Sequence, residues 1–329
     1  MSGLEGVGAI RIHEWGGPEN MVWDKIDVPA PNFMEATVRQ SFVGLNYIDV
    51  YHRTGLYPVP HLPAVIGMEA AGVVEAVGSE VEGLAVGDRV AYAAPPVGAY
   101  AEARNIPADR LVKLPNSIDD KTAAGMMLQG MTVEYLLRRT YPVKAGETIL
   151  VHAAAGGVGL MMCQWAKHLG ATVIGTVGSE EKAELAKAAG CDHTILYRKQ
   201  HFAEQVTELT NGAGVPVIYD GIGADTVEQG FQCLKPRGMM VTFGNASGPV
   251  PEIPMAWLAA GSHFVTRPSL MAYTASREDL VASAKALFEV VEAGAVKIDI
   301  RQTYPLKEAA SAHYDLEARR TTGTTVFEV

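Results

Sequence analysis

Cysteine is scarce in this sequence, long apolar runs are missing, and basic residues are outnumbered by acidic ones. The three cysteines, Cys163, Cys191 and Cys233, are an odd number without C-x-x-C spacing, which argues against a disulfide scaffold or a structural zinc site. No stretch reaches the length of a membrane span, and the N-terminus has no basic start. A formal net charge of −10 argues against nucleic acid or an anionic membrane as the main partner. We therefore expect a cytoplasmic protein.

The chain has 329 residues, which suits two domains, and its pattern changes near residue 116. Before that point, alternating segments such as "GAIRIHEWGG" and "GVVEAVG" are cut by glycine, as is typical of a compact, partly closed β-barrel. One short helix is expected from Asn46, over "NYIDVYHR". A long helix is expected at the domain junction, where Ser117 and Asp120 have the spacing of a capping box.

From Glu147 onward, apolar strands alternate with amphipathic helices. The expected strands are "TILVHA", "ATVIGT", "HTILY", "PVIYD" and "MMVTFG", and "GVGLMMCQWAKHLG", "SEEKAELAKAAG", "FAEQVTELT" and "DTVEQGFQCL" are the helices between them. This alternation predicts a parallel sheet covered on both faces. After "HFVTRPS" it stops, and "REDLVASAKALFEVVEAG", "PLKEAASAHYDLEA" and "TTVFEV" follow as helix, mixed segment and strand. The pattern by itself leaves open which domain they join.

The segment "LVHAAAGGVGLMM", residues 150–162, resembles the dinucleotide-binding pattern G-x-G-x-x-G. Gly156 and Gly159 occupy its second and third positions, and Ala154 replaces the first glycine. Gly156 would let the backbone approach a pyrophosphate, and Gly159 would let the helix pack closely on the strand. The N–H groups that begin the helix would face the phosphates. The alternative is a plain glycine-rich turn, which the strand–loop–helix context disfavours.

The end of the second strand indicates which dinucleotide would bind. NAD-binding proteins place an acidic residue there to bind the ribose 2′-hydroxyl, and here that position is Val177. Ser179 follows, and Lys182 lies one turn into the next helix, so that a 2′-phosphate would meet a cation and no carboxylate. Tyr197 and Arg198 could add an aromatic face and a second charge. The sequence therefore predicts NADPH rather than NADH, although Lys182 could also be an ordinary solvated lysine.

Five segments, spread in order over nearly the whole chain, resemble one known family. They are "GLNYIDVYHRTGLYP", "GMEAAGVVEAVG", "GDRVAY", "HAAAGGVGLMMCQWAKHLGA" and "VTRPSL". As a set they resemble the zinc-independent quinone oxidoreductases of the medium-chain dehydrogenase/reductase superfamily. The resemblance implies an α/β chain with a GroES-like, partly closed β-barrel catalytic domain at 1–130 and 268–329. It also implies a Rossmann doubly wound parallel sheet that binds NADPH at 131–267, and a homodimer formed through the edge of that sheet.

The zinc ligands of the superfamily's alcohol dehydrogenases have no counterpart here. Asn46 and Met68 occupy the positions of the Cys and His ligands, and no cysteine precedes Cys163. Because an amide and a thioether are poor Zn²⁺ ligands, we expect no metal, and we interpret Glu69 as structural. Without zinc, an alcohol is not easily deprotonated, whereas a quinone or an enone can accept hydride directly.

The resemblance also implies site residues, of which Asn46, Tyr57 and Arg267 are the expected catalytic ones. Asn46 would bond the acceptor oxygen or the cofactor carboxamide, and it could also be a helix N-cap. Tyr57 would stack on the acceptor or donate a proton, or would be only a wall residue. Arg319 would reach the 2′-phosphate, although the adjacent Arg320 leaves that choice open. The expected cofactor-binding residues are Asn46, Gly130, Thr132, Ala155, Gly156, Gly157, Val158, Gly178, Lys182, Tyr197, Gly221, Phe243, Gly244, Arg267 and Arg319.

The resulting expectation is an enzyme that transfers hydride from NADPH to a quinone, acting on a small molecule and not on nucleic acid or a membrane. One alternative is a reductase of α,β-unsaturated carbonyls, which needs the same zinc-free site. Another is a non-catalytic structural or RNA-binding role. The intact glycine loop and the acidic charge weigh against that last alternative.

Overall fold

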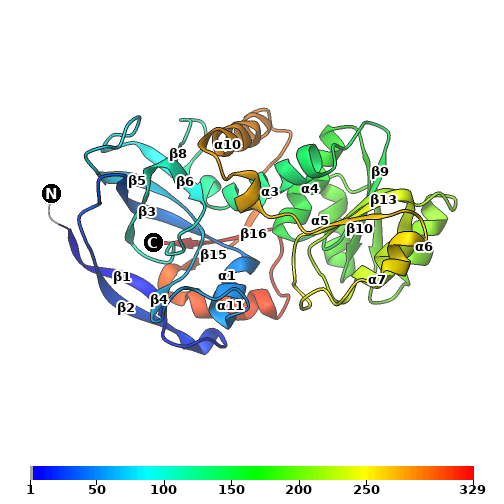
Figure 1. The fold of residues 1–329 in the computed structure, drawn as a ribbon, viewed down its shortest axis with the longest axis horizontal. Helices are drawn as coiled ribbons and strands as arrows, with labels where there is room; N and C mark the ends of the chain where they lie inside the picture. The colour runs from blue at the N-terminus through cyan, green and yellow to red at the C-terminus, as the bar shows by residue number, and fades with distance from the viewer. Residues whose placement is uncertain (1–2) are drawn as a thin grey trace. The chain divides into compact units, whose positions relative to one another are not determined.

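A computed structural model describes residues 3–329, and the chain forms two compact units (Figure 1). Unit 1 takes in the chain up to Met131, together with Thr274–Phe288 and Ile298–Val329. Unit 2 comprises Thr132–Tyr273 and Glu289–Lys297. These units are defined by their internal contacts, and the domain limits expected at 130 and 268 stay a prediction. Within the described residues, no helix is both long and apolar enough to cross a membrane.

Unit 1 is rich in β-strands, as the glycine-punctuated alternation predicts, and these strands form two sheets. A seven-stranded sheet has the order β15-β16-β3-β5-β6-β8, with β7 also paired to β3, and a three-stranded sheet has the order β2-β1-β4. Their strands are β1 (Leu4–Ile12), β2 (Met21–Val28), β3 (Glu35–Leu45), β4 (Ala64–Val65), β5 (Glu69–Val77), β6 (Arg89–Ala93), β7 (Ala103–Pro107), β8 (Val112–Lys113), β15 (Ile300–Pro305) and β16 (Thr324–Glu328). The C-terminal β16 therefore pairs with β3, nearly three hundred residues away along the chain.

The core of unit 1 joins side chains from both ends of the sequence. Ile10 of β1, Val38 of β3 and Tyr92 of β6 are buried in one cluster with Tyr100 and Phe327. The rings of Tyr100 and Phe327 meet edge to face, with centroids 5.0 Å apart. This packing gives the C-terminal segment a core to join, which the sequence pattern left undecided.

The helix expected after Ser117 is shorter than predicted and begins at another residue. Asp119 is the N-cap, because its carboxylate accepts from the backbone N–H of Thr122 at 2.8 Å. The carboxylate of Asp120 instead accepts from Arg89 and Ser41. The capping box predicted at Ser117 and Asp120 is therefore wrong. The junction consists of α2 (Asp120–Ala124), α3 (Met127–Tyr135) and a π-helical turn, η3 (Leu136–Thr140).

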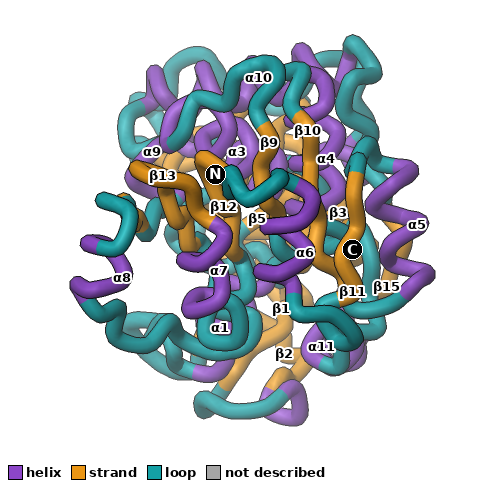
Figure 2. The backbone as a smooth tube through the Cα atoms, turned by 90° about the vertical axis from the view of Figure 1, so that its right-hand side faces the viewer, coloured by secondary structure: helices purple, strands orange, loops and turns teal. Residues whose placement is uncertain are grey.

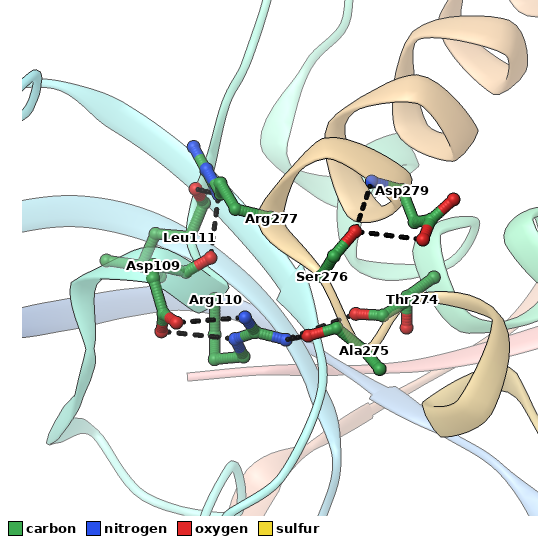
Figure 3. Close-up of polar contacts among 8 residues, drawn as sticks. All are labelled: Asp109, Arg110, Leu111, Thr274, Ala275, Ser276, Arg277 and Asp279. Carbon is green, nitrogen blue, oxygen red and sulfur yellow. Dashed lines mark hydrogen bonds and ion pairs between the residues drawn. The ribbon is translucent and has the colours of Figure 1, made fainter.

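Two arginines attach the returning chain to the first part of unit 1, next to the 3-10 turn η2 (Ala108–Arg110) (Figure 3). Arg110 donates through Nη1 to the carbonyl of Thr274 at 3.1 Å. Arg277 donates in the opposite direction, to the carbonyls of Asp109 and Leu111 at 2.9 and 2.6 Å. These reciprocal bonds fix the start of α10 (Arg277–Glu292) on unit 1. Further 3-10 turns are η1 (Pro18–Asn20) and η4 (Leu306–Glu308), and the remaining helices of unit 1 are α1 (Tyr47–Thr54) and α11 (Ala309–Glu317).

Unit 2 contains a six-stranded sheet in the order β11-β10-β9-β12-β13-β14, and every neighbouring pair is parallel. The strands are β9 (Thr148–Val151), β10 (Thr172–Val177), β11 (His193–Leu196), β12 (Val215–Asp220), β13 (Leu234–Thr242) and β14 (Phe264–Thr266). The helices are α4 (Gly157–His168), α5 (Glu180–Ala188), α6 (Phe202–Leu209), α7 (Val227–Cys233), α8 (Met255–Ala259) and α9 (Leu270–Tyr273). The predicted alternation of strands and helices is confirmed, whereas β14, α8 and α9 were not expected.

One face of this sheet is covered by α6 and α7 (Figure 2). Leu150, Ile174 and Ile218 from three adjacent strands pack in one buried cluster with Phe202 of α6 and Phe231 of α7. The strands carry apolar side chains on both faces because helices cover both, which is why they read as continuous apolar runs. The strand order reverses between β9 and β12, and at such a switch point the carboxyl ends of the strands open toward a ligand.

Candidate functional site

In unit 2, the glycine loop turns sharply between β9 and α4. Gly156 is the N-cap of α4, and the first turn of this helix carries no acidic residue. A Cβ added to Gly159 would overlap the carbonyl oxygen of Ala153 and lie 2.7 Å from the carbonyl carbon of Ala154, so only glycine permits this close approach of helix and turn. A Cβ added to Gly156 would meet only the Ala153 oxygen, at 3.3 Å. Gly159 thus serves packing, while Gly156 leaves open space at the helix N-terminus.

Ala153, rather than Ala154, takes the strained conformation of the turn. Its φ is +53°, which an L-residue adopts at a cost of about 1 kcal/mol. The carbonyl of Ala153 accepts from the N–H of Gly156 at 2.9 Å, and the N–H of Ala154 donates to Thr176 at 3.1 Å. These bonds hold the turn in place. Ala154 is tolerated at the first glycine position because the left-handed residue lies one position earlier.

A second cluster in unit 2 lies around Gly178, at the end of β10. A Cβ on Gly178 would lie 3.4 Å from the hydroxyl of Tyr197 and 3.6 Å from Nε of Arg198. The Arg198 guanidinium is 6.0 Å from the centre of the Tyr197 ring. Ser179 is the N-cap of α5, and its Oγ accepts from the N–H of Lys182 at 3.3 Å. The Arg198 guanidinium and the hydroxyl of Tyr197 thus lie beside Gly178, and the backbone of Lys182 is held in the first turn of α5, at the end of the strand next to β9.

The loops after β12 and β13 pack against each other at the carboxyl end of the sheet. The ring of Phe243 packs against Gly221, since a Cβ added to Gly221 would lie 3.1 Å from Cζ of Phe243. The N–H of Phe243 donates to the carbonyl of Asp220 at 2.8 Å. Gly244 approaches Gly221 closely, and its carbonyl accepts from Nη1 of Arg267 at 3.3 Å. The structure thus brings together four residues that the sequence singled out: Gly221, Phe243, Gly244 and Arg267.

In unit 1, the side-chain amide of Asn46 is held between two neighbours. Its Nδ2 donates to Oε2 of Glu69 at 2.6 Å, and its Oδ1 accepts from Nε2 of Gln129 at 3.2 Å. Gln129 in turn accepts, through Oε1, from the hydroxyl of Thr324 at 2.9 Å. The other oxygen of Glu69 accepts from the N–H of Leu128 at 2.8 Å. The orientation of the Asn46 amide is therefore fixed from both sides.

A second buried chain of hydrogen bonds starts at the backbone of Asn46. Asn46 is the N-cap of α1, and its N–H donates to Oδ2 of Asp49 at 2.9 Å in the reciprocal bond of a capping box; the hydroxyl of Tyr100 donates to the same oxygen at 3.1 Å. His313 lies between Tyr100 and Arg53, with Nε2 2.9 Å from the Tyr100 hydroxyl and Nδ1 3.0 Å from the guanidinium. Since a guanidinium can only donate, Nδ1 accepts and Nε2 carries the proton.

Burial shifts the pKa values of these groups. Complete burial raises the pKa of Glu69 to about 8 and that of Asp49 to about 7, although hydrogen bonds to both carboxylates oppose the shift. Burial, helped by the Arg53 charge, lowers the pKa of His313 to about 3. The two carboxyls therefore destabilise the fold progressively as pH rises from about 4, near their pKa in the unfolded chain, to about 7 to 8, and His313 does so as pH falls from about 6.5 to about 3.

The other predicted site residues have less specific surroundings. Tyr57 is partly exposed in the loop after α1, and its ring meets that of Tyr51 edge on, at 5.2 Å. Gly130 lies against Leu287 of α10, where a Cβ would be 2.7 Å from Cδ2. Thr132 is buried in α3. Arg319 follows α11 with a φ of +59°, and its charge acts on the Tyr47 hydroxyl, whose pKa burial raises. Asn46, Tyr57, Gly130 and Arg319 belong to unit 1, and Thr132 belongs to unit 2.

Comparison with known proteins places this chain in a family. The model described as "Alcohol dehydrogenase GroES-like domain" matches residues 32–116, and the model described as "Zinc-binding dehydrogenase" matches residues 157–286. A quinone oxidoreductase from Pseudomonas aeruginosa is 51% identical over 319 residues, which cover 97% of this chain and 98% of that protein. The chain belongs to the quinone oxidoreductase family of the medium-chain dehydrogenase/reductase superfamily. Unit 1 accordingly has the GroES-like fold and unit 2 the Rossmann fold.

Two further relatives show the range of this family. The crystal structure of Escherichia coli quinone oxidoreductase, complexed with NADPH, superposes with a TM-score of 0.96 at 46% identity and covers 98% of this chain and all of that one. A 2-haloacrylate reductase from Burkholderia sp is 47% identical over 326 residues, which cover 97% of this chain and 98% of that protein. Overall identity therefore does not separate quinone oxidoreductases from a reductase of an activated alkene.

The residues of this family member do not fit the zinc ion for which one matching model is described. Asn46 and Met68, which the resemblance predicts at the positions of the Cys and His ligands, carry a neutral amide and a thioether, and the amide is already bonded to Glu69 and Gln129. Across residues 3–329, no three His, Cys, Asp or Glu side chains come together to hold a metal ion.

Sequence reasoning missed most of the polar network around Asn46. Glu69 was read only as structural, and Gln129 and Thr324 carry no motif, since 195 residues separate them along the chain. The one available indication was the glutamate in "GMEAAG", an acidic residue followed by the apolar run "AAGVV". A buried charge in such a segment requires partners, and these come from elements that only folding brings close.

The two loop glycines give a matched pair of variants. Gly159→Ala should destabilise unit 2 by about 1–3 kcal/mol, because its methyl group would overlap the backbone of Ala153 and Ala154. Gly156→Ala should change the unfolding free energy by less than about 1 kcal/mol while placing a methyl group at the helix N-terminus, where it would weaken dinucleotide binding. Thermal denaturation and cofactor titration of both variants check this. Equal destabilisation by the two substitutions would contradict the assignment of packing to Gly159 alone.

Proposed function

We propose that this protein reduces quinones with NADPH as the electron donor. The observation that carries the proposal is the combination of an open helix N-terminus at Gly156 and a basic end at Gly178 in a chain of this family. When bound, NADPH supplies a hydride from its nicotinamide ring. The chain's own residues bind and orient the two reactants and hold the groups that bond to the acceptor oxygen.

The residues of unit 2 fit NADPH. The pyrophosphate would lie at the start of α4, against the backbone N–H groups of Gly157 and Val158, with Ala155 and Gly156 beside it; the N–H of Gly156 itself donates to Ala153. The 2′-phosphate would lie near Gly178, where Lys182, Arg198 and the hydroxyl of Tyr197 can bind an anion and no carboxylate ends the strand. Phe243, Gly244 and Arg267 would line the nicotinamide end, and Arg319 of unit 1 would add charge to the phosphate.

The choice between NADPH and NADH depends on Lys182. Lys182→Ala should raise the dissociation constant of NADPH about tenfold while leaving that of NADH within about twofold, since only NADPH carries the 2′-phosphate. Lys187→Ala, on the same helix, is the control, because that lysine pairs with Glu184. Nicotinamide fluorescence measures the six affinities, for wild type and the two variants with each cofactor. A wild-type protein that binds NADH as tightly as NADPH would contradict the proposed role of Lys182.

We propose a zinc-independent reaction, and the donor set at Asn46 and Met68 supports it. Without a metal, the acceptor must already be electron-poor, which favours quinones. Asn46 would bond the acceptor oxygen or the nicotinamide carboxamide, and Tyr57 would stack beside the acceptor. Reduction of an alkene conjugated to a carboxyl or carbonyl group is the second candidate function, because the 2-haloacrylate reductase is as similar as the quinone oxidoreductases.

A panel of acceptors decides between these activities. We expect NADPH oxidation with ortho- and para-quinones at a kcat/KM at least about tenfold above that with 2-haloacrylates and enones, in protein without stoichiometric zinc. Absorbance of NADPH follows its oxidation with each acceptor, and elemental analysis of the same preparation measures its zinc content. Faster turnover of the activated alkenes would reverse the assignment, and stoichiometric zinc would overturn the metal-free reaction. NADPH binding without turnover of any acceptor would favour a non-catalytic role.

We propose a homodimer joined along β14. This strand ends the six-stranded sheet and pairs only with β13 among the described strands, and it exposes Phe264 and Val265. An exposed apolar sheet edge favours pairing with a second copy. Sedimentation should show a dimer that Phe264→Glu converts to monomer without changing NADPH affinity. A monomeric wild-type protein at micromolar concentration would contradict this.

We also propose a cytoplasmic protein that does not bind nucleic acid. Three free, buried cysteines and a net charge of −10 support these two assignments, because free thiols persist in a reducing compartment and acidic chains repel phosphate backbones.

A further inference from the structure

The Asn46 amide has a defined number of hydrogen-bonding positions left for a ligand. An amide has two N–H donors and two acceptor positions, and the bonds to Glu69 and Gln129 use one of each. In the described structure, one N–H of Asn46 therefore remains for a bound molecule, whereas the side-chain oxygen also takes part in the capping box with the N–H of Asp49. Turning the amide over would exchange these two positions, so whatever fixes the amide decides which atom a ligand meets.

We propose that Glu69 is the positioning residue of the site. Its carboxylate accepts from one N–H of the Asn46 Nδ2, and this bond fixes the amide so that the second N–H of Nδ2 is the donor offered to the ligand. This inference rests on the proposed function, since the ligand in front of Asn46 is the nicotinamide carboxamide or the acceptor oxygen. Glu69 itself is fully buried and acts through Asn46.

The surroundings of Glu69 are built for a carboxylate at this place. Its Oε1 accepts from the N–H of Leu128 at 2.8 Å, so the side chain is fixed at a second point. Gly44 of β3 leaves room for it, because a Cβ there would overlap Oε2 and lie 2.8 Å from the carboxyl carbon. A buried carboxylate without such an arrangement would be costly to the fold. The close fit therefore indicates a positional role and not a residue that merely fills space.

The charge of Glu69 decides the direction of the bond to Asn46. An ionised carboxylate can only accept, so Asn46 must offer Nδ2, whereas a protonated carboxyl could donate to Oδ1 of a turned amide. Gln129 and the hydroxyl of Thr324 could reverse with it, because both groups can donate and accept. The groups that face Glu69 from the packed elements are Asp49 of α1, Tyr92 of β6 and Tyr100. The nearby negative charge of Asp49 favours protonation of Glu69 and thus the turned state.

A double-mutant cycle tests whether Glu69 acts through Asn46. The four proteins are wild type, Glu69→Gln, Asn46→Ala and the double variant, each measured for NADPH affinity by fluorescence and for kcat/KM with a quinone. We expect Glu69→Gln to weaken at least one of these about tenfold in the wild-type background and less than about twofold in the Asn46→Ala background. Effects that multiply independently in both measurements would overturn the proposal. Binding without quinone turnover, but with the same coupling, would refute only the proposed reaction.

The pH profile separates positioning from a general loss of stability. In wild type, whichever of NADPH affinity and quinone kcat/KM shows coupling between Glu69 and Asn46 should increase as pH rises through about 8, because Glu69 then ionises and holds Nδ2 of Asn46. This inflection should vanish in Glu69→Gln and in Asn46→Ala. Asp120→Asn is the control, since Asp120 accepts from Arg89 and Ser41 and has no bond to Asn46, and it should keep the inflection. An inflection that survives in Glu69→Gln would contradict the proposal.

A second variant keeps the test decisive if Glu69→Gln does not fold. Gln129→Met removes the donor on the other side of the Asn46 amide and leaves Glu69 in place. Carried through the same cycle, it should also lose most of its effect in the Asn46→Ala background. Independent effects here would likewise overturn the positioning of the amide by its two neighbours.

Discussion

The bond between the buried carboxylate of Glu69 and the amide of Asn46 is the constraint on which the site in unit 1 depends. It joins the start of α1 to the first residue of β5, and the second oxygen of Glu69 fixes the start of α3. Gln129 extends the same network to Thr324 on β16, so that Asn46 from the N-terminal part and Thr324 from the C-terminal part both bond to the Gln129 side chain. Burial raises the pKa of Glu69 to about 8, and these hydrogen bonds oppose that shift by favouring the ionised carboxylate, which fixes one orientation of the amide.

In unit 2, the central constraint is that the backbone at the N-terminus of α4 stays free of side chains. Its glycine loop brings α4 so close to the turn that no side chain fits at Gly159, and it leaves open space at Gly156. The strain of the turn is confined to Ala153, where the carbonyl and the neighbouring N–H groups hold the conformation. The basic end at Gly178 follows from the same strand order, because β9 and β10 are adjacent and parallel and their carboxyl ends share one edge.

Prediction from the sequence was most accurate where local pattern and tertiary packing agree. The helix from Gly157 and the strands from Thr148 to Asp220 have periodic apolar faces, and the structure places them as expected. At the domain junction, any of the three polar residues in "SIDD" could cap the helix. Asp119 is the N-cap, because the carboxylate of Asp120 is bonded to Arg89 and Ser41 instead. The family resemblance was correct because it rested on ordered motifs over nearly the whole chain, and relatives at about half identity confirm it.

The sequence by itself determined the parallel sheet, the glycine loop, the missing acidic residue at Val177 and the poor zinc donors at Asn46 and Met68. These features depend on residue type and local spacing, which folding does not change. The tertiary structure alone decided that residues 274–288 return to unit 1, through Arg110 and Arg277, and that the Asn46 amide is fixed by Glu69 and Gln129. Hydrogen bonds between residues distant in sequence have no local pattern, because only the packed core brings their atoms within reach.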